Sequence, residues 1–157
     1  MKKDQDFIRE AIDLSARNLN HKEGGPFGAV VVKEGKIIGK GWNTVVRDND
    51  PTAHAEVNAI RDACKTLNSF QLDGCTLYTS CEPCPMCLGA IYWARPEKVV
   101  FAASRKDAEN AGFDDSFIYN EIPLPPEKRK IKFIQLSENE AKAVFDKWNK
   151  LDKKVHY

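Results

Sequence analysis

The chain lacks several features that would assign it to a class at once. No apolar run approaches the roughly 20 residues needed to cross a bilayer, so we expect no membrane span. The opening residues, MKKDQDFIRE, turn acidic before any apolar stretch and do not have the pattern of a secretory signal peptide. No internal repeat or low-complexity segment occurs, which argues against a repeat architecture.

An excess of charge of one sign is also missing. Lys and Arg total 24 against 23 Asp and Glu, which gives a net charge of +1. That balance does not support long-range attraction of nucleic acid or of an anionic membrane, and we expect neither as a partner. The 157 residues, 42% hydrophobic and 30% charged, are typical of one soluble globular domain spanning residues 1–157.

Cysteine is scarce and unevenly placed. The chain has five cysteines, an odd number, and three of them fall within the seven positions from Cys81 to Cys87. In a chain without a secretory signal, this pattern favours a metal or catalytic site over a disulfide framework. We therefore expect a cytoplasmic protein.

Hydrophobic patterning predicts helices and strands in a mixed order. The expected helices cover 4–20, 50–67, 84–94 and a last segment opened by a capping-box pattern at 137–140. The expected strands cover 29–32, 36–42, 75–80, 99–103 and 131–136. Helices separate the later strands, so these should pair in parallel. The pattern predicts a three-layer α/β/α sandwich around a central mixed sheet of about five strands.

The residues with metal-binding chemistry lie at the starts of two predicted helices. Cys84 and Cys87 are three positions apart in the first turn of one helix, so both thiols share a face at the positive end of the helix dipole. His54 lies thirty positions before Cys84 and offers a third ligand. One imidazole and two thiolates match a catalytic zinc site, which keeps a fourth position for water.

Glu56 follows His54 by two positions, and we expect it to exchange protons with that water. Two thiolates cancel the charge of the ion and make it a weaker Lewis acid, so a nearby base is needed. Cys81 also forms a C-x-x-C pair with Cys84, but it should lie at a strand end and miss the metal. The alternative is a structural zinc held by His54 and all three cysteines, and such a site has no need of Glu56.

The motifs H-A-E at 54–56 and P-C-x-x-C at 83–87 resemble the zinc nucleobase deaminases of the cytidine deaminase superfamily. Further blocks resemble the bacterial guanine deaminases within it: residues 24–30, 50–63, 77–96, 111–119 and the terminal tyrosine. The resemblance implies hydrolysis of guanine to xanthine and ammonia, with one Zn²⁺ per subunit. Water would add at C2, and Glu56 would protonate ring N3. A tRNA adenosine deaminase shares the motif and the fold and is the main alternative, and a non-catalytic zinc scaffold is the third.

The resemblance also implies a second proton carrier and several substrate contacts. Asp115 matches the aspartate assigned to the departing ammonia, while its residue type alone fits a turn or cap equally well, and only the match separates it from Asp114. Asn43 is expected to bind a base edge, although a turn asparagine is as common at such a position. Phe27 either stacks on the purine or packs against the sheet. Further contacts are expected from Ala55, Trp93 and Tyr157.

The predicted helix at 84–94 is apolar nearly all round, which predicts that one side faces the sheet and the other faces a second copy in a homodimer. The resemblance implies that the C-terminal segment from about residue 124 is exchanged, so that Tyr157 covers the site of the partner. The run from Pro123 to Pro126 is a hinge for that exchange or a plain loop. His156 is expected to be exposed and without a catalytic role.

Overall fold

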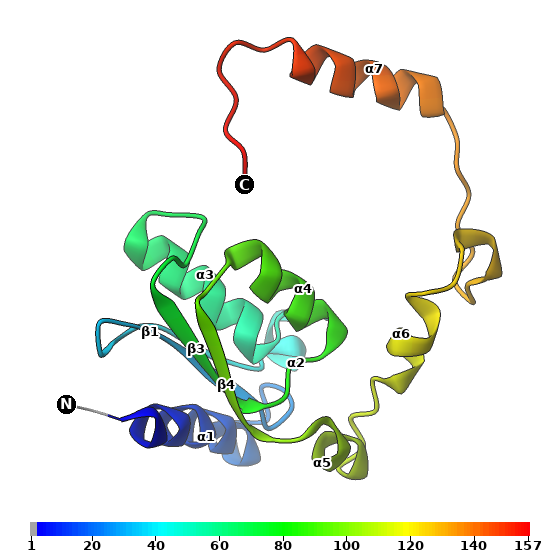
Figure 1. The fold of residues 1–157 in the computed structure, drawn as a ribbon. Coiled ribbons are helices and arrows are strands. Elements are labelled where there is room, and N and C mark those ends of the chain that lie inside the picture. Colours follow the sequence, from blue (N-terminus) through cyan, green and yellow to red (C-terminus); the bar gives the residue numbers. More distant parts are fainter. Residues whose placement is uncertain (1–2) are drawn as a thin grey trace. The chain divides into compact units, whose positions relative to one another are not determined.

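The computed structural model describes residues 3–157 (Figure 1). The chain divides into two units, one ending at Asp115 and the other running from Ser116 to Tyr157. The first unit contains α1 (Asp4–His21), β1 (Gly28–Lys33), β2 (Lys36–Trp42), α2 (Val45–Asp48), α3 (Ala55–Leu67), β3 (Cys75–Cys81), α4 (Pro85–Ala94), β4 (Lys98–Ala103) and α5 (Arg105–Asn110). The second contains α6 (Ser116–Glu121), a 3₁₀ turn η1 (Pro126–Lys128) and α7 (Glu138–Asn149).

The strands of the first unit form one mixed sheet in the order β2-β1-β3-β4. β1 is antiparallel to both β2 and β3, whereas β3 and β4 are parallel. The parallel pair follows from the α4 crossover between those strands, as the sequence predicts. Helix α1 covers one face, and α3 and α4 cover the other (Figure 1). This arrangement confirms the expected α/β/α layers.

Alternation along β1 divides the core into two layers. Val30 and Val32 pack with residues of α1, while Ala29 and Val31 pack with residues of α3 and α4. All four side chains are at most 5% exposed. Because successive side chains of a strand point to opposite faces, one short apolar strand anchors helices on both sides of the sheet.

Gly41 sets how closely α3 approaches β2. A Cβ added at this position would lie 2.2 Å from the carbonyl oxygen of Ala55 and 2.4 Å from the amide nitrogen of Ala59. Only glycine permits that approach, because any side chain would overlap the helix backbone. The contact holds the N-terminus of α3 against the sheet, and that N-terminus carries His54 and Glu56.

The expected helix from residue 50 begins later than predicted. The carboxylate of Asp50 accepts bonds from the backbone N–H and the hydroxyl of Thr52, at 2.8 and 2.7 Å, and so forms a local turn instead of a helix cap. The long helix, α3, begins at Ala55 with His54 as its N-cap residue. The short α2 precedes this turn, and the sequence pattern did not predict it.

The strand predicted at 131–136 does not form in the described part of the chain, so the sheet has four strands. Ile131, Ile134 and Leu136 are 65–80% exposed in an extended segment. A strand requires backbone partners, and this segment has no strand beside it in its own unit. The capping box at 137–140 is also absent, because Ser137 has a left-handed φ of 52° and its side chain makes no cap bond to α7. Among the described residues, no helix combines the length and the apolar character needed to cross a membrane.

Candidate active site

Three metal-ligating side chains converge where two helices begin. His54 is the N-cap residue of α3, Cys84 is the N-cap residue of α4, and Cys87 lies in the first turn of α4 behind Pro85. The Nδ1 atom of His54 lies 3.5 Å from the Sγ of Cys84 and 3.4 Å from the Sγ of Cys87. The ligand atoms of these residues all lie within 4.8 Å of one another, as the sequence predicts.

These distances fit a tetrahedral zinc ion. With usual zinc–nitrogen and zinc–sulfur bond lengths, tetrahedral geometry places the two ligand atoms about 3.6 Å apart. The Cys87 thiol, by its hydrogen bond, and the His54 imidazole lower the pKa of Cys84 to about 4, so this thiol is readily ionised. Imidazole and thiolate are ligands that suit zinc, and these three residues leave a fourth tetrahedral position to another group.

Cys81 stands apart from this group, as expected. It is the last residue of β3, it is 6% exposed, and its thiol donates to the carbonyl of Ser104 at 3.5 Å. Burial, reinforced by the charge of Glu56, raises the pKa of Cys81 to about 11. Its thiol is directed at that carbonyl and is not part of the group formed by His54, Cys84 and Cys87, so the geometry does not support the four-ligand alternative.

Glu56 lies beside the ligand group on the first turn of α3. Its side chain is buried, with 6% of the residue exposed, and its Oε2 accepts from the Cys87 thiol at 3.4 Å. Burial raises the pKa of Glu56, opposed by hydrogen bonds from its own backbone N–H and from Cys87. A carboxylate whose pKa is raised in this way takes up a proton more readily than a solvent-exposed one, as a general base requires.

Asp115 occupies a second carboxylate position at the end of the first unit. Its Oδ1 lies 2.9 Å from the Nε of Arg105, and its side chain is 17% exposed. Burial raises the pKa of Asp115, the Arg105 guanidinium lowers it, and the negative charge of Cys84 raises it again. Asp114, in contrast, is exposed. The structure thus separates two aspartates that the residue types alone do not distinguish.

Two residues near Asp115 were missed by the sequence analysis. Arg105 is the ion-pair partner just described, and its backbone N–H donates to Oε2 of Glu82 at 2.9 Å. Glu82 lies inside the Cys81–Cys84 motif, but nothing in that motif indicates a contact with α5. Such a contact depends on the parallel pairing of β3 and β4, which brings the ends of both strands together.

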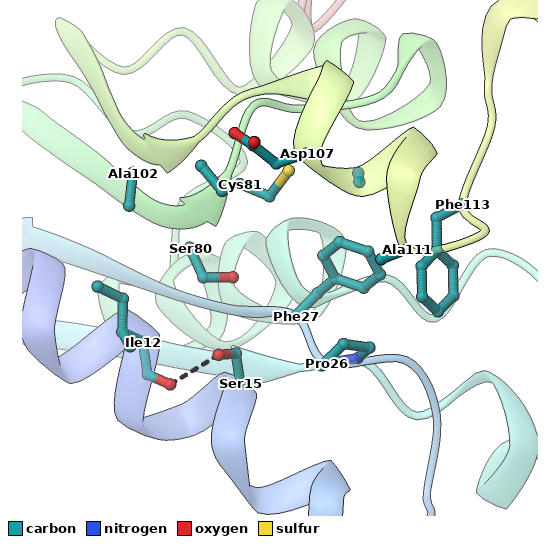
Figure 2. A pocket seen from close by; sticks show the side chains of 12 residues that line it. Ile12, Ser15, Pro26, Phe27, Ser80, Cys81, Ala102, Asp107, Ala111 and Phe113 are labelled. Atoms are coloured by element: carbon teal, nitrogen blue, oxygen red, sulfur yellow. Dashed lines mark hydrogen bonds between the residues drawn. The ribbon is translucent and has the colours of Figure 1, made fainter.

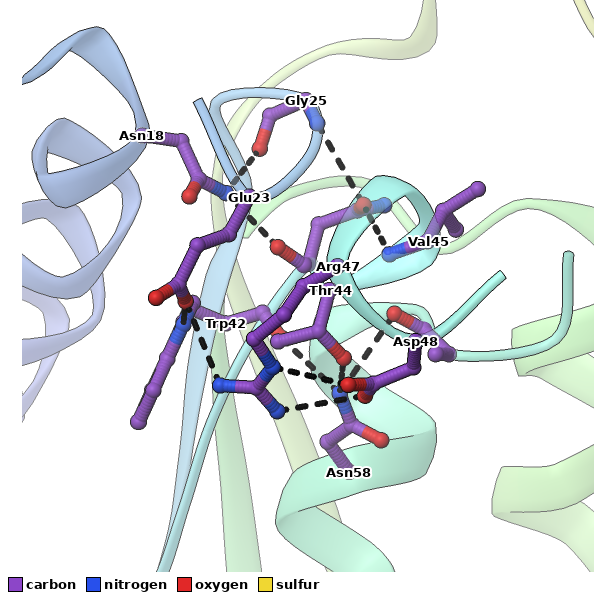
Figure 3. Close-up of polar contacts among 11 residues, drawn as sticks. Asn18, Glu23, Gly25, Trp42, Thr44, Val45, Arg47, Asp48 and Asn58 are labelled. Carbon is purple, nitrogen blue, oxygen red and sulfur yellow. Dashed lines mark hydrogen bonds and ion pairs between the residues drawn. The ribbon is translucent and has the colours of Figure 1, made fainter. Parts of the chain in front are cut away.

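Asn43 has a structural role in the loop that follows β2. Its Oδ1 accepts from the backbone N–H groups of Gly25 and Val45, at 3.3 and 3.2 Å (Figure 3). These two donors determine which end of the amide is the oxygen, so Nδ2 is the end available as a hydrogen-bond donor to a ligand. Asn43 can therefore hold this turn through its Oδ1 and still bind a base through its Nδ2.

Phe27 belongs to an aromatic pair. Its ring packs edge to face against Phe113, with centroids 4.9 Å apart and planes at 84°, and it also contacts the buried core. Both rings line a largely apolar cavity of about 370 Å³ that also reaches Cys81 and Asp107 (Figure 2). Phe27 thus packs against Phe113 and the core, and its contact with a purine stays a prediction.

The three remaining residues predicted to contact the substrate lie in different parts of the structure. Ala55 is the first residue of α3 and is fully buried. Trp93 lies on the outer surface of α4 and is 63% exposed. Tyr157 belongs to the second unit and is 68% exposed. His156 is exposed, as expected.

The chain is similar to several known proteins. Residues 1–103 match the family model for the cytidine and deoxycytidylate deaminase zinc-binding region. A guanine deaminase of Bacillus subtilis is 57% identical over 96% of this chain and 97% of its own length. Its X-ray structure has a TM-score of 0.96 and covers 99% of both chains at 55% identity. A tRNA-specific adenosine deaminase of Aquifex aeolicus is 40% identical over 92% of each chain. A guanine deaminase structure from Nitrosomonas europaea has a TM-score of 0.67 at 35% identity, covering 73% of this chain and 66% of its own.

Proposed function

This chain belongs to the cytidine and deoxycytidylate deaminase family, and from that premise we propose that it hydrolyses guanine to xanthine and ammonia. The observation that carries the proposal is its likeness to the guanine deaminase of Bacillus subtilis, which extends over almost the whole of both chains. The tRNA-specific adenosine deaminase of Aquifex aeolicus is less similar over a comparable length. The site contributes the remaining support, because it pairs three zinc-type ligands with two carboxylates.

His54, Cys84 and Cys87 would hold one zinc ion per subunit. When bound, zinc supplies a Lewis acid that lowers the pKa of water enough to make it a nucleophile at neutral pH. The protein must then move protons between the attacking water, the purine ring and the departing amine. The scaffold alternative does not explain why a buried carboxylate accompanies the three ligands.

Glu56 carries the first proton. The attacking water loses a proton to the Glu56 carboxylate, and the carboxyl then delivers it to N3 of guanine, the ring acceptor next to C2. Its raised pKa favours the first step, because a more basic carboxylate takes a proton from water more readily. The product of these steps is a purine with a tetrahedral C2 that carries both the new oxygen and the amino group.

Asp115 assists the departure of the amino group. The amino group can leave as ammonia only after it is protonated, so the proton that the new C2 hydroxyl loses as the C2 carbonyl forms must reach the exocyclic nitrogen while the bond between C2 and that nitrogen breaks. The Asp115 carboxyl is largely buried, and its pKa is raised in spite of the neighbouring Arg105. It is therefore suited to hold and pass that proton, while Arg105 limits how far its pKa rises.

Binding of the purine falls to the residues around the loop before β1. Asn43 offers its Nδ2 as a donor to a ring acceptor, while its Oδ1 is held by the loop backbone. Phe27 presents an aromatic ring for contact with the purine face, braced by Phe113. Ala55 contributes through its backbone at the start of α3.

Substrate profiling tests the proposal. The zinc-loaded protein should release ammonia from guanine, and release much less from adenine or cytosine, under the same conditions. An anticodon stem-loop containing adenosine should give no inosine. Inosine formation without guanine turnover would establish the tRNA deaminase alternative, and absence of both activities in zinc-loaded protein would leave only the scaffold.

We further propose that two copies associate and exchange their C-terminal segments. Large apolar side chains are exposed on α4 (Leu88, Tyr92, Trp93) and on α7 (Val144, Phe145, Trp148). Exposed apolar faces of this size favour a partner. Within residues 3–157, no strand pairs with the outer edge of β4, and segment 131–136 of another copy has the length to do so.

Exchange would carry Tyr157 to the site of the partner, where its ring would cover the purine. Light scattering on the zinc-loaded protein should give the mass of a dimer, and a monomer would contradict this assembly. Deletion of Tyr157 should raise KM for guanine while the mass stays that of a dimer. Unchanged kinetics after the deletion would show that the tail does not cover the site.

We also place the protein in the cytoplasm. All five cysteines are free, including the buried Cys75 and Cys81. Thiols used as metal ligands persist in a reducing compartment, whereas an oxidising one favours disulfides. Fractionation of cells that express the tagged full chain should recover it with cytoplasmic markers.

A further inference from the structure

One side-chain amide on α1 joins the two segments that carry the proposed purine contacts. The Nδ2 of Asn18 donates to the backbone carbonyl of Gly25 at 2.7 Å and to that of Asn43 at 2.7 Å (Figure 3). Gly25 lies in the loop before β1, whereas Asn43 follows β2. A single buried NH₂ group therefore connects two loops that lie 18 positions apart in the sequence.

Backbone hydrogen bonds extend this connection to both contact residues. The Phe27 N–H donates to the Gly25 carbonyl at 2.9 Å, and the Phe27 carbonyl accepts from the Asn43 N–H at 3.1 Å. The Oδ1 of Asn43 accepts in turn from the Gly25 N–H at 3.3 Å. Asn18 thus restrains the backbone of Phe27 and of Asn43 at the same time.

Core packing does not explain an asparagine at this position. Asn18 is 6% exposed, and its Oδ1 is buried without a hydrogen-bond partner in the part of the chain that the structure describes. An unpaired buried oxygen carries a free-energy penalty. Leucine has a similar size and would fill the same space without it. The asparagine is explained by what its two N–H groups hold.

We propose that Asn18 is a positioning residue for purine binding, which sets the placement of Phe27 relative to the Nδ2 of Asn43. This inference rests on the proposed function. In the part of the chain that the structure describes, the side-chain amide of Asn18 donates to the two loops and not to Glu56 or the metal ligands, so it acts through the binding groups. Its loss should therefore weaken binding of guanine more than it slows the chemical step.

The substitution Asn18→Leu removes both donors and keeps a side chain of similar size. KM for guanine should rise about tenfold or more while kcat stays within about threefold, because binding is lost equally from substrate and transition state. Zinc content should remain that of the unsubstituted protein. In a Glu56→Ala background, where chemistry is blocked, calorimetry should show the Kd for guanine rising by the same factor as KM.

The matched control is Asn20→Leu on the same helix. Asn20 is exposed, so this variant makes the same chemical change outside the hydrogen-bonded loops and should alter neither KM nor kcat. A second variant, Gly24→Ala, disturbs the hydrogen bond between Gly25 and Asn43 from the loop before β1. Its Cβ would lie 2.0 Å from the Oδ1 of Asn43, so it should reproduce the rise in KM without touching the core.

The outcomes separate this inference from the proposed function. Unchanged KM in Asn18→Leu and Gly24→Ala would overturn the inference, and so would a joint loss of kcat and zinc, which indicates general disruption. If Asn18→Leu does not fold, Asn18→Ala, which also removes both donors, decides in its place, because Gly24→Ala displaces Asn43 itself. Unsubstituted, zinc-loaded protein that releases no ammonia from guanine would instead overturn the proposed function and this inference with it.

Discussion

The guanidinium of Arg105 lies 2.9 Å from the carboxylate of Asp115, and these two residues come from opposite ends of the α5 region. Burial and the charge of Cys84 raise the pKa of Asp115, while Arg105 lowers it. The protonation state of Asp115 is therefore set jointly by the zinc-ligand group and by a cation on another segment. This ion pair links the start of α5 to the proposed second proton carrier.

Replacing Asp115 tests that role. Asp115→Asn should lower kcat for guanine by about 10²-fold or more, the usual contribution of a positioned acid or base, with a smaller effect on KM. Asp114→Asn is the matched control, and because Asp114 is exposed it should change kcat by less than about twofold. Steady-state ammonia release measures both. Equal losses in the two variants would contradict the assignment.

Replacing Arg105 tests whether its charge lowers the pKa of Asp115. Arg105→Gln removes the cation that lowers the pKa of Asp115, so the pKa of the carboxyl should rise further. The limb of the pH–rate profile that belongs to Asp115 should then move to higher pH. The same substitution in an Asp115→Asn background should leave the profile unmoved. A shift that persists in the double variant would show that another group titrates.

Glu56 is expected to be required for chemistry and dispensable for the metal. Glu56→Gln keeps the shape of the side chain but cannot carry a proton, so kcat should fall by about 10²- to 10⁴-fold. Zinc content, measured by atomic absorption, should stay at that of the unsubstituted protein. The exposed Glu97 provides the control, since Glu97→Gln should retain full activity. Loss of zinc from Glu56→Gln would indicate a structural role instead.

The two C-x-x-C cysteines should respond differently to the same substitution. Cys84→Ser removes an ionised ligand and should abolish both bound zinc and ammonia release. Cys81→Ser changes a protonated thiol that donates to Ser104, so zinc content should be retained. Dialysis against a chelator should inactivate the unsubstituted protein, and added zinc should restore it. Loss of zinc from Cys81→Ser would instead support a structural zinc held by His54 and all three cysteines.

Tyr78 should make the stability of the protein sensitive to alkaline pH. Its hydroxyl donates to Asp4 at 2.7 Å, and burial together with this carboxylate raises the pKa of Tyr78 to about 12. An unfolded tyrosine has a pKa of about 10. Between these values the folded state holds the proton more tightly, so stability is complete below about pH 10 and falls as pH rises towards about 12.

The substitution Tyr78→Phe isolates that contribution. It should lower the melting temperature at pH 8 by a few degrees, because the hydrogen bond to Asp4 is lost. It should also flatten the fall in melting temperature that the unsubstituted protein shows between about pH 10 and pH 11. Tyr92→Phe, at an exposed position of α4, is the control. If the melting temperature of Tyr78→Phe falls by the same amount over this pH range, other groups cause the decline.

The metal-binding residues were predictable because their arrangement is local. His54 and Cys84 are helix N-cap residues, and Cys87 lies in the first turn of α4, so short-range helix geometry places each ligand at the start of its helix. The order of helices and strands along the chain predicted the layers. The start of α3 was misplaced because the side chain of Asp50 bonds to Thr52, and a competing local turn of this kind resembles a helix cap in sequence.

By itself, the sequence determined the metal-ligand set, the position of Glu56 two residues after His54, and the longer helices and the four strands of the first unit. Tertiary structure alone decided that Arg105 pairs with Asp115 and that Asn18 connects two distant loops. It also decided that 131–136 is not a strand within its own unit. The physical reason is range: caps and helix turns depend on near neighbours, whereas ion pairs, buried amides and strand partners depend on segments that only folding brings together.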